Sequence, residues 1–202
     1  MKPLPLAAAL LFWAAAPAAA HRITPGTAGF TDGLQHPFGL PAHIMLILGV
    51  GLLLGRHDVA AWRLPTYAFL AGLTAGLAGG PLAMTPALDA RLAVALLALA
   101  VLLGGMVALA RPLPSLLLLA LGALTGFGLG LDSAPEGGTL QQTVGALAGS
   151  GFAMIFALLN AAMLAQYAHG RIGRQAWQKI GVRIVGSWIA AAGIMVLALQ
   201  LR

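Results

Sequence analysis

Two histidines, His36 and His43, lie at the start of the first long apolar run after the amino-terminal segment, within the stretch HPFGLPAH. An imidazole inside an apolar span is costly, and in membrane proteins such a residue commonly marks a functional site. Neutral imidazole is a ligand for divalent transition metals. We therefore predict that His36 and His43 ligate a cation.

The spacing of the two histidines sets a geometric condition on this site. Seven residues are two helical turns, so in a straight helix the two side chains lie about 10 Å apart along the axis. At that separation they would hold an ion in succession, unless Pro37 and Pro41 break the backbone and bring them together. The positive amino end of the helix favours the neutral form of His43.

Three further residues are weaker candidates for the same cation. Asp32 lies four residues before His36 and would share its face of a helix. His21 would become the amino-terminal residue after removal of a signal peptide, where its amine and imidazole can chelate. Asp132 lies in a loop expected on the same side of the membrane. The predicted metal ligands are therefore His36, His43, Asp32, His21 and Asp132.

The composition is that of a membrane protein. Of the 202 residues, 60% are hydrophobic and 8% are charged, with a mean hydropathy of +0.93, whereas a soluble domain carries about 25% charged residues. The net charge of +6 does not indicate nucleic-acid binding, because the basic residues fall in loops between apolar runs. The absence of cysteine excludes disulfides, thiolate ligands and cysteine catalysis.

The hydropathy pattern predicts an all-α bundle of about six transmembrane helices after a cleavable signal peptide. Residues 1–20 carry one basic residue, an apolar core and a final Ala-Ala-Ala, typical of a signal peptide; an uncleaved first span is the alternative. Residues 21–202 form one membrane domain. Its spans are expected at about 39–55, 64–84, 91–110, 113–131, 143–167 and 184–199.

The basic residues predict the orientation of these spans. Loops after the first, third and fifth spans hold seven of them, namely Arg56, Arg63, Arg111, Arg171, Arg174, Lys179 and Arg183. The opposite side of the mature chain holds three, namely Arg22, Arg91 and Arg202. The first set is expected in the cytoplasm, which places both mature termini outside.

Glycines at four-residue spacing, such as Gly122 and Gly126, predict close contact between helices. The stretch Gly149-Ser150-Gly151 is similar to the serine motif of intramembrane proteases. A catalytic serine needs a histidine within hydrogen-bond reach, but the nearest downstream histidine, His169, lies about 28 Å away along the same helix. His43 is expected to have no acidic residue that orients it. Because no phosphate loop, haem motif or catalytic carboxylate pair is present either, we expect neither an enzyme nor a tightly bound cofactor.

The chain resembles the HupE/UreJ family of bacterial membrane proteins over nearly its whole length. The resemblance includes a signal peptide followed by a histidine, the HP-x5-H entry at residues 36–43, and six short glycine-rich spans. Members of this family are regarded as nickel or cobalt permeases associated with hydrogenase and urease maturation. The resemblance implies an inner-membrane protein with Ni²⁺ or Co²⁺ as cargo. A second copy of the chain and metalloenzyme maturation proteins are the further partners it implies.

The chain departs from the family's motifs at several positions. The first motif has the form HPxxGxDH, but here Ala42 replaces the acid and the glycine lies one place early, at Gly39. The second motif, FHGxAHG, corresponds to residues 127–131 without either histidine, and a histidine often found in the fifth span is Asn160.

The sequence favours a membrane protein that binds or passes a divalent transition metal. One alternative is a scaffold or assembly partner with the same fold that does not transport. Another is a permease for a different small solute, with a path lined by Asn160, Gln166 and Thr125.

Overall fold

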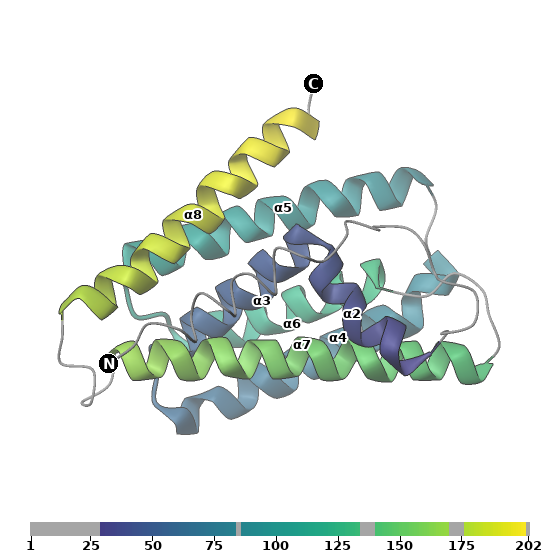
Figure 1. Ribbon diagram of the computed structural model, residues 1–202, viewed down its shortest axis with the longest axis horizontal. Helices are drawn as coiled ribbons and strands as arrows, with labels where there is room; N and C mark the ends of the chain where they lie inside the picture. Colours follow the sequence, from purple (N-terminus) through teal and green to yellow (C-terminus); the bar gives the residue numbers. More distant parts are fainter. Residues whose placement is uncertain (1–28, 84–85, 134–139, 170–175, 201–202) are drawn as a thin grey trace, which may run out of the picture.

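The computed structural model describes residues 29–83, 86–133, 140–169 and 176–200, and these residues are all helix or short connection. A 3₁₀ helix, η1 (Val59–Trp62), precedes α4. Figure 1 shows the seven α-helices of these ranges: α2 (Phe30–Gly39), α3 (Pro41–Leu54), α4 (Arg63–Ala83), α5 (Pro86–Leu109), α6 (Ser115–Asp132), α7 (Leu140–His169) and α8 (Ala176–Gln200).

Helices α3 to α8 each overlap one of the six predicted apolar runs, although α5 begins five residues and α8 eight residues before the predicted start. In the described ranges four helices are long and apolar enough to cross a membrane, at Leu88–Leu109, Ser115–Asp132, Leu147–Ala168 and Lys179–Gln200. The bent pair α2 and α3 makes a fifth if it counts as one span, and α4 is not among them. The predicted signal peptide and His21 lie outside the described residues.

The segment before the first predicted span is itself a helix. The axes of α2 and α3 meet at an angle of 91° at Leu40, which has an extended backbone (φ −111°, ψ 111°). Pro41 explains the break, because proline has no N–H for the helical ladder and pushes the preceding residue out of the helical region. With 14 residues, α3 is about 21 Å long, shorter than the roughly 30 Å hydrocarbon core of a bilayer.

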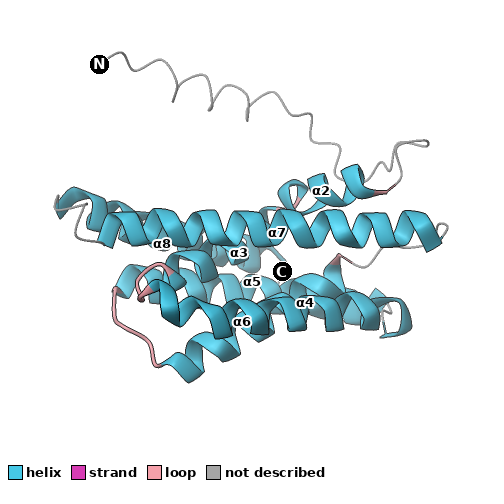
Figure 2. Cartoon of the chain, turned by 90° about the horizontal axis from the view of Figure 1, so that it is seen from below, coloured by secondary structure: helices cyan, strands magenta, loops and turns pink. Residues whose placement is uncertain are grey.

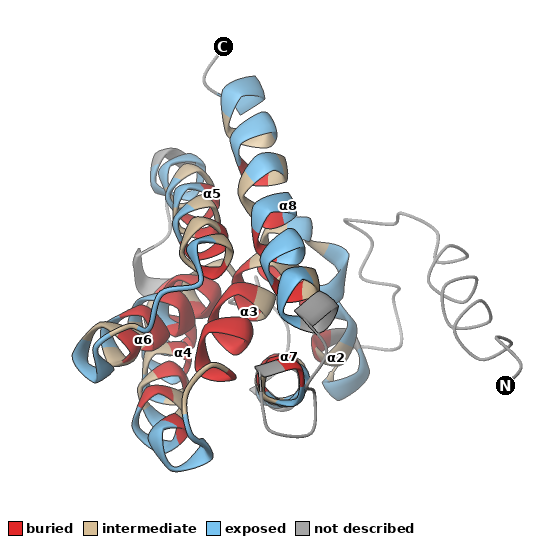
Figure 3. Cartoon of the chain, turned by 90° about the vertical axis from the view of Figure 1, so that its left-hand side faces the viewer, coloured by how far each residue is buried: buried red, intermediate tan, exposed pale blue. Residues whose placement is uncertain are grey.

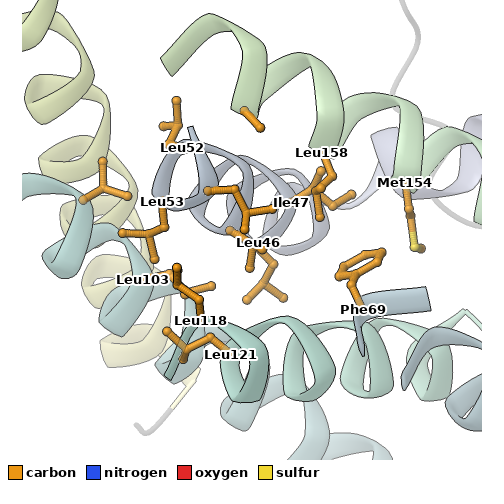
Figure 4. Close-up of a cluster of buried hydrophobic side chains, with 14 of the residues drawn as sticks. Leu46, Ile47, Leu52, Leu53, Phe69, Leu103, Leu118, Leu121, Met154 and Leu158 are labelled. Atoms are coloured by element: carbon orange, nitrogen blue, oxygen red, sulfur yellow. The ribbon is translucent and has the colours of Figure 1, made fainter. Parts of the chain in front are cut away.

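Helix α3 lies at the centre of the bundle. Figure 3 shows most of its ribbon in the colour of buried residues, while α8 exposes most of its surface. Figure 4 shows the apolar side chains around it, with Leu46 and Ile47 of α3 near Leu158 of α7 and Leu53 near Leu103 of α5. These side chains are at most 1% exposed, so the middle of the bundle is a closed apolar core.

Glycines allow the helices to approach at backbone distance, as their spacing predicted. A Cβ added at Gly126 of α6 would collide with the backbone carbonyl of Phe69 in α4, and one at Gly76 with that of Phe127. Gly51 and Gly55 face the backbone of α7 in the same way. Close backbone contact therefore holds α4 to α6 and α3 to α7.

At one end of the bundle, which we call the Arg56 end, polar side chains cap the carboxyl ends of helices. Arg56 donates to the carbonyls of Val107 (2.7 Å) and Met106 (3.5 Å) at the end of α5, and Arg183 donates to Ala108 (3.0 Å). A guanidinium satisfies carbonyls that have no helical partner and interacts favourably with the negative end of the helix dipole.

The packing predicts opposite results for two glycine-to-alanine changes. Gly126→Ala would force α4 and α6 apart, and overpacking of this kind costs about 1–3 kcal/mol. Gly105→Ala, where an added Cβ meets nothing within 4 Å, should gain up to about 1 kcal/mol from helix propensity. Thermal unfolding in detergent measures both. Equal unfolding temperatures for the two variants would contradict the close contact between α4 and α6.

Candidate metal site

His43 is held by a carboxylate from another helix. It is the third residue of α3, its side chain is fully buried, and its Nε2 lies 2.6 Å from Oδ2 of Asp132, the last residue of α6. The expectation that no acidic residue orients His43 is therefore wrong. The two residues are 89 positions apart in the sequence, and only the packing of α3 beside α6 brings them together. An ionised carboxylate can only accept a hydrogen bond, so it fixes the proton of neutral His43 on Nε2.

The other ring nitrogen of His43 is left without a partner. His43 Nδ1 is buried and makes no hydrogen bond within the described part of the chain, and the same holds for Oγ of Ser133, next to Asp132. Leaving a polar atom buried and unpaired costs about 1–3 kcal/mol. With its proton on Nε2, His43 presents the lone pair of Nδ1, which is the form that ligates a metal.

His36 approaches His43 across the helix break. The centroids of the two rings are 5.7 Å apart, with an interplanar angle of 67°, so the alternative in which the histidines converge is the one observed. With metal–nitrogen bonds of about 2.1 Å, two imidazoles on one ion have centroids about 5 to 6 Å apart. The separation therefore fits two rings that share one ion. His43 is buried while His36 is exposed.

The structure says less about the two weaker candidates Asp32 and His21. Asp32 belongs to α2, one turn before His36, but its side chain and His21 lie outside the described residues. Where side chains are described, no group of three or more imidazoles and carboxylates is arranged to hold an ion as it stands. The structure brings together a histidine pair and Asp132, which binds one of the two rings.

Of the three polar residues expected to line a path for another solute, two donate hydrogen bonds to backbone carbonyls. Asn160 is exposed and donates to the carbonyl of Phe156 in its own helix (2.7 Å). With its amide nitrogen turned toward α3, Gln166 donates to the carbonyls of Gly55 (2.7 Å) and His57 (2.9 Å), which caps the end of that helix. Thr125 is buried, and its hydroxyl has no partner within the described ranges.

The Arg56 end offers no comparable cation site among the described residues. Burial lowers the pKa of His57 and the neighbouring Arg56 lowers it further, while Asp58 partly offsets both effects. Burial also lowers the pKa of Arg56, and the nearby Arg183 guanidinium adds to that shift. Guanidinium groups close to His57 repel a metal cation. The imidazoles at the two ends of α3 therefore have opposite electrostatic surroundings.

The family model described as HupE / UreJ protein matches residues 8–196. The chain belongs to the HupE / UreJ family. No curated protein and no solved structure matches it.

Asp132 falls at a position of the second motif to which the chain was compared. In the HupE / UreJ motif FHGxAHG the second histidine follows the phenylalanine by five positions, and five positions after Phe127 stands Asp132. Residues 127–131 contain neither histidine of the motif, and the acid follows directly at position 132. This spacing is the sequence signal that relates Asp132 to the motif. Asp132 therefore stands at the position of the motif's second histidine and contacts His43.

The contact predicts the tautomer of His43. In the wild type we expect the ¹⁵N chemical shifts of the His43 ring, at a pH where it is neutral, to show a protonated Nε2 and an unprotonated Nδ1. Asp132→Ala should shift the ring toward a mixture of both tautomers, because the acceptor that selects Nε2–H is gone. Asp89→Ala, an exposed acid in the first turn of α5, is the control. An unchanged His43 spectrum in Asp132→Ala would contradict the role of Asp132.

Proposed function

We propose that this HupE / UreJ protein crosses the inner membrane six times and binds a divalent transition metal at the His43 end for entry into the cell. The observation that carries the proposal is the convergence of His36 and His43 across the break at Leu40, with Asp132 bound to His43. Discontinuous helices with a ligand site at the break recur in membrane transporters.

The distribution of charge supports the orientation. Arg56, Arg63, Arg111 and Arg183 all lie in or beside the connections at the Arg56 end. By the positive-inside rule this end faces the cytoplasm. The His43 end and both mature termini then face the periplasm, and the site receives cations from outside.

At the His43 end, each of three residues has a separate role in binding the ion. The exposed His36 meets the ion first, and Nδ1 of His43 binds it while Asp132 holds Nε2. A carboxylate on the far nitrogen of a ligating histidine orients the ring and raises its basicity. Two imidazoles with few further donors make a weak site, and weak binding suits a cargo that must leave again.

The donor set also limits the choice of ion. Imidazole with carboxylate suits borderline divalent metals such as Ni²⁺ and Co²⁺, while the absence of cysteine removes the soft thiolate donor that favours Cu⁺. Below His43, the apolar core around α3 separates the site from the Arg56 end. Passage of the ion therefore requires α3 or its neighbours to move.

A scaffold of the same fold that does not transport is the second candidate. The observation that favours it is the loss of family ligands: Ala42 replaces an acid and Gly128 replaces a histidine. A permease for another solute is less well supported, because Asn160 and Gln166 are bonded to backbone carbonyls.

Accumulation of Ni²⁺ and Co²⁺ in cells tests the proposal. We expect uptake above the empty vector for the wild type, loss of that uptake in His36→Ala and His43→Ala, and affinity reduced about 10- to 100-fold in Asp132→Asn. His57→Ala is the matched control, since it removes an imidazole at the opposite end of α3 and should leave uptake unchanged.

Membrane abundance of all variants is matched by immunoblotting. Accumulation equal to the empty vector for the wild type would exclude nickel and cobalt transport and leave the scaffold. Uptake that survives both histidine changes would place the cargo path elsewhere in the bundle.

A further inference from the structure

The carbonyl of Gly33 in α2 has lost its normal helical partner. In an α-helix the N–H of residue 37 would donate to the carbonyl of residue 33, but residue 37 is proline and has no N–H. The hydroxyl of Ser150 in α7 donates to this carbonyl at 2.9 Å. Ser150 is 2% exposed, so water cannot readily take its place.

Around this hydrogen bond α2 lies directly on α7. An added Cβ at Gly149 would collide with the carbonyl of Phe30, and one at Gly145 would press on the backbone of Gly29 and Phe30. The rings of Phe30 and Phe152 are 6.4 Å apart. Figure 2 shows α2 seated along α7. Because α2 leaves α3 at 91°, its position depends mainly on α7.

We propose that Ser150 is a positioning residue for the metal site. Its hydroxyl supplies the donor that Pro37 removes, so that the Gly33 carbonyl stays satisfied while α2 packs against Gly145 and Gly149 of α7. This packing in turn holds His36 against His43. Gly33 lies one turn before His36 on the same helix, so a displacement at Gly33 moves His36 directly. This inference rests on the proposed function, because it assigns Ser150 a role in the same site.

The proline gives the proposal a specific test. Ser150→Ala leaves the Gly33 carbonyl without a donor, and we expect affinity for Ni²⁺, measured by calorimetry on the purified protein, to fall about tenfold, as for loss of a supporting residue at other metal sites. Pro37→Ala restores a backbone N–H at position 37 that can donate to Gly33, so in that background the same serine change should have little effect. Ser187→Ala, which removes a hydroxyl bonded within its own helix to Ile184, is the control.

A structural readout separates positioning from metal binding. The chain has no cysteine, so spin labels can be attached at Gln35→Cys in α2 and Met163→Cys in α7, both of which are exposed. Ser150→Ala should broaden or shift the distance distribution between the labels, and Pro37→Ala with Ser150→Ala should restore a narrow one.

An unchanged label distance and unchanged affinity in Ser150→Ala would overturn the proposal, as would an equal loss with and without Pro37. If the wild type binds no Ni²⁺, the proposed function fails. The label distances then still decide whether Ser150 positions α2.

Discussion

A buried backbone carbonyl that has lost its helical partner needs another donor, and this constraint acts on the first helix of the structure. Pro37, which is buried, and Pro41, which begins α3, each remove an N–H from the helical ladder. The Gly33 carbonyl, which has lost the N–H of residue 37, accepts a hydrogen bond from the hydroxyl of Ser150 instead. This hydrogen bond stabilises α2 beside the break at Leu40. The same break gives His36 and His43 their short separation.

The two ends of the bundle differ in chemistry because different helix termini meet there. At the Arg56 end the carboxyl ends of α3 and α5 present carbonyls, and the sequence supplies Gln166, Arg56 and Arg183 as donors. At the His43 end the amino end of α3 meets the carboxyl end of α6. A carboxylate is favoured beside the positive end of a helix, which stabilises Asp132 next to His43. The described charged side chains nearest the two ends of α3 are thus a carboxylate at one end and guanidinium groups at the other.

The sequence predicted the helices well and the site only in part. Apolar runs located α3 to α8 because burial and length dominate the behaviour of such segments. Convergence of the histidines was one of two alternatives, since prolines permit a break without fixing its angle. The contact between His43 and Asp132 was not predicted, because it depends on how α6 is placed beside α3. The roles of Ser150 and Gln166 were missed for the same reason, as each bonds to a carbonyl on a different helix.

Two of the departures from the family motifs concern carboxylates near His43. Where the first motif has an acid, directly before its second histidine, this chain has Ala42, and where the second motif has a histidine, it has Asp132. The carboxylate that contacts His43 comes from α6 and not from α3. Adjacent residues of a helix point about 100° apart, so an acid at position 42 would not face the ring as Asp132 does from α6. In the proposed metal site, the hydrogen bond from His43 Nε2 to Asp132 orients the ring and leaves the Nδ1 lone pair free for an ion.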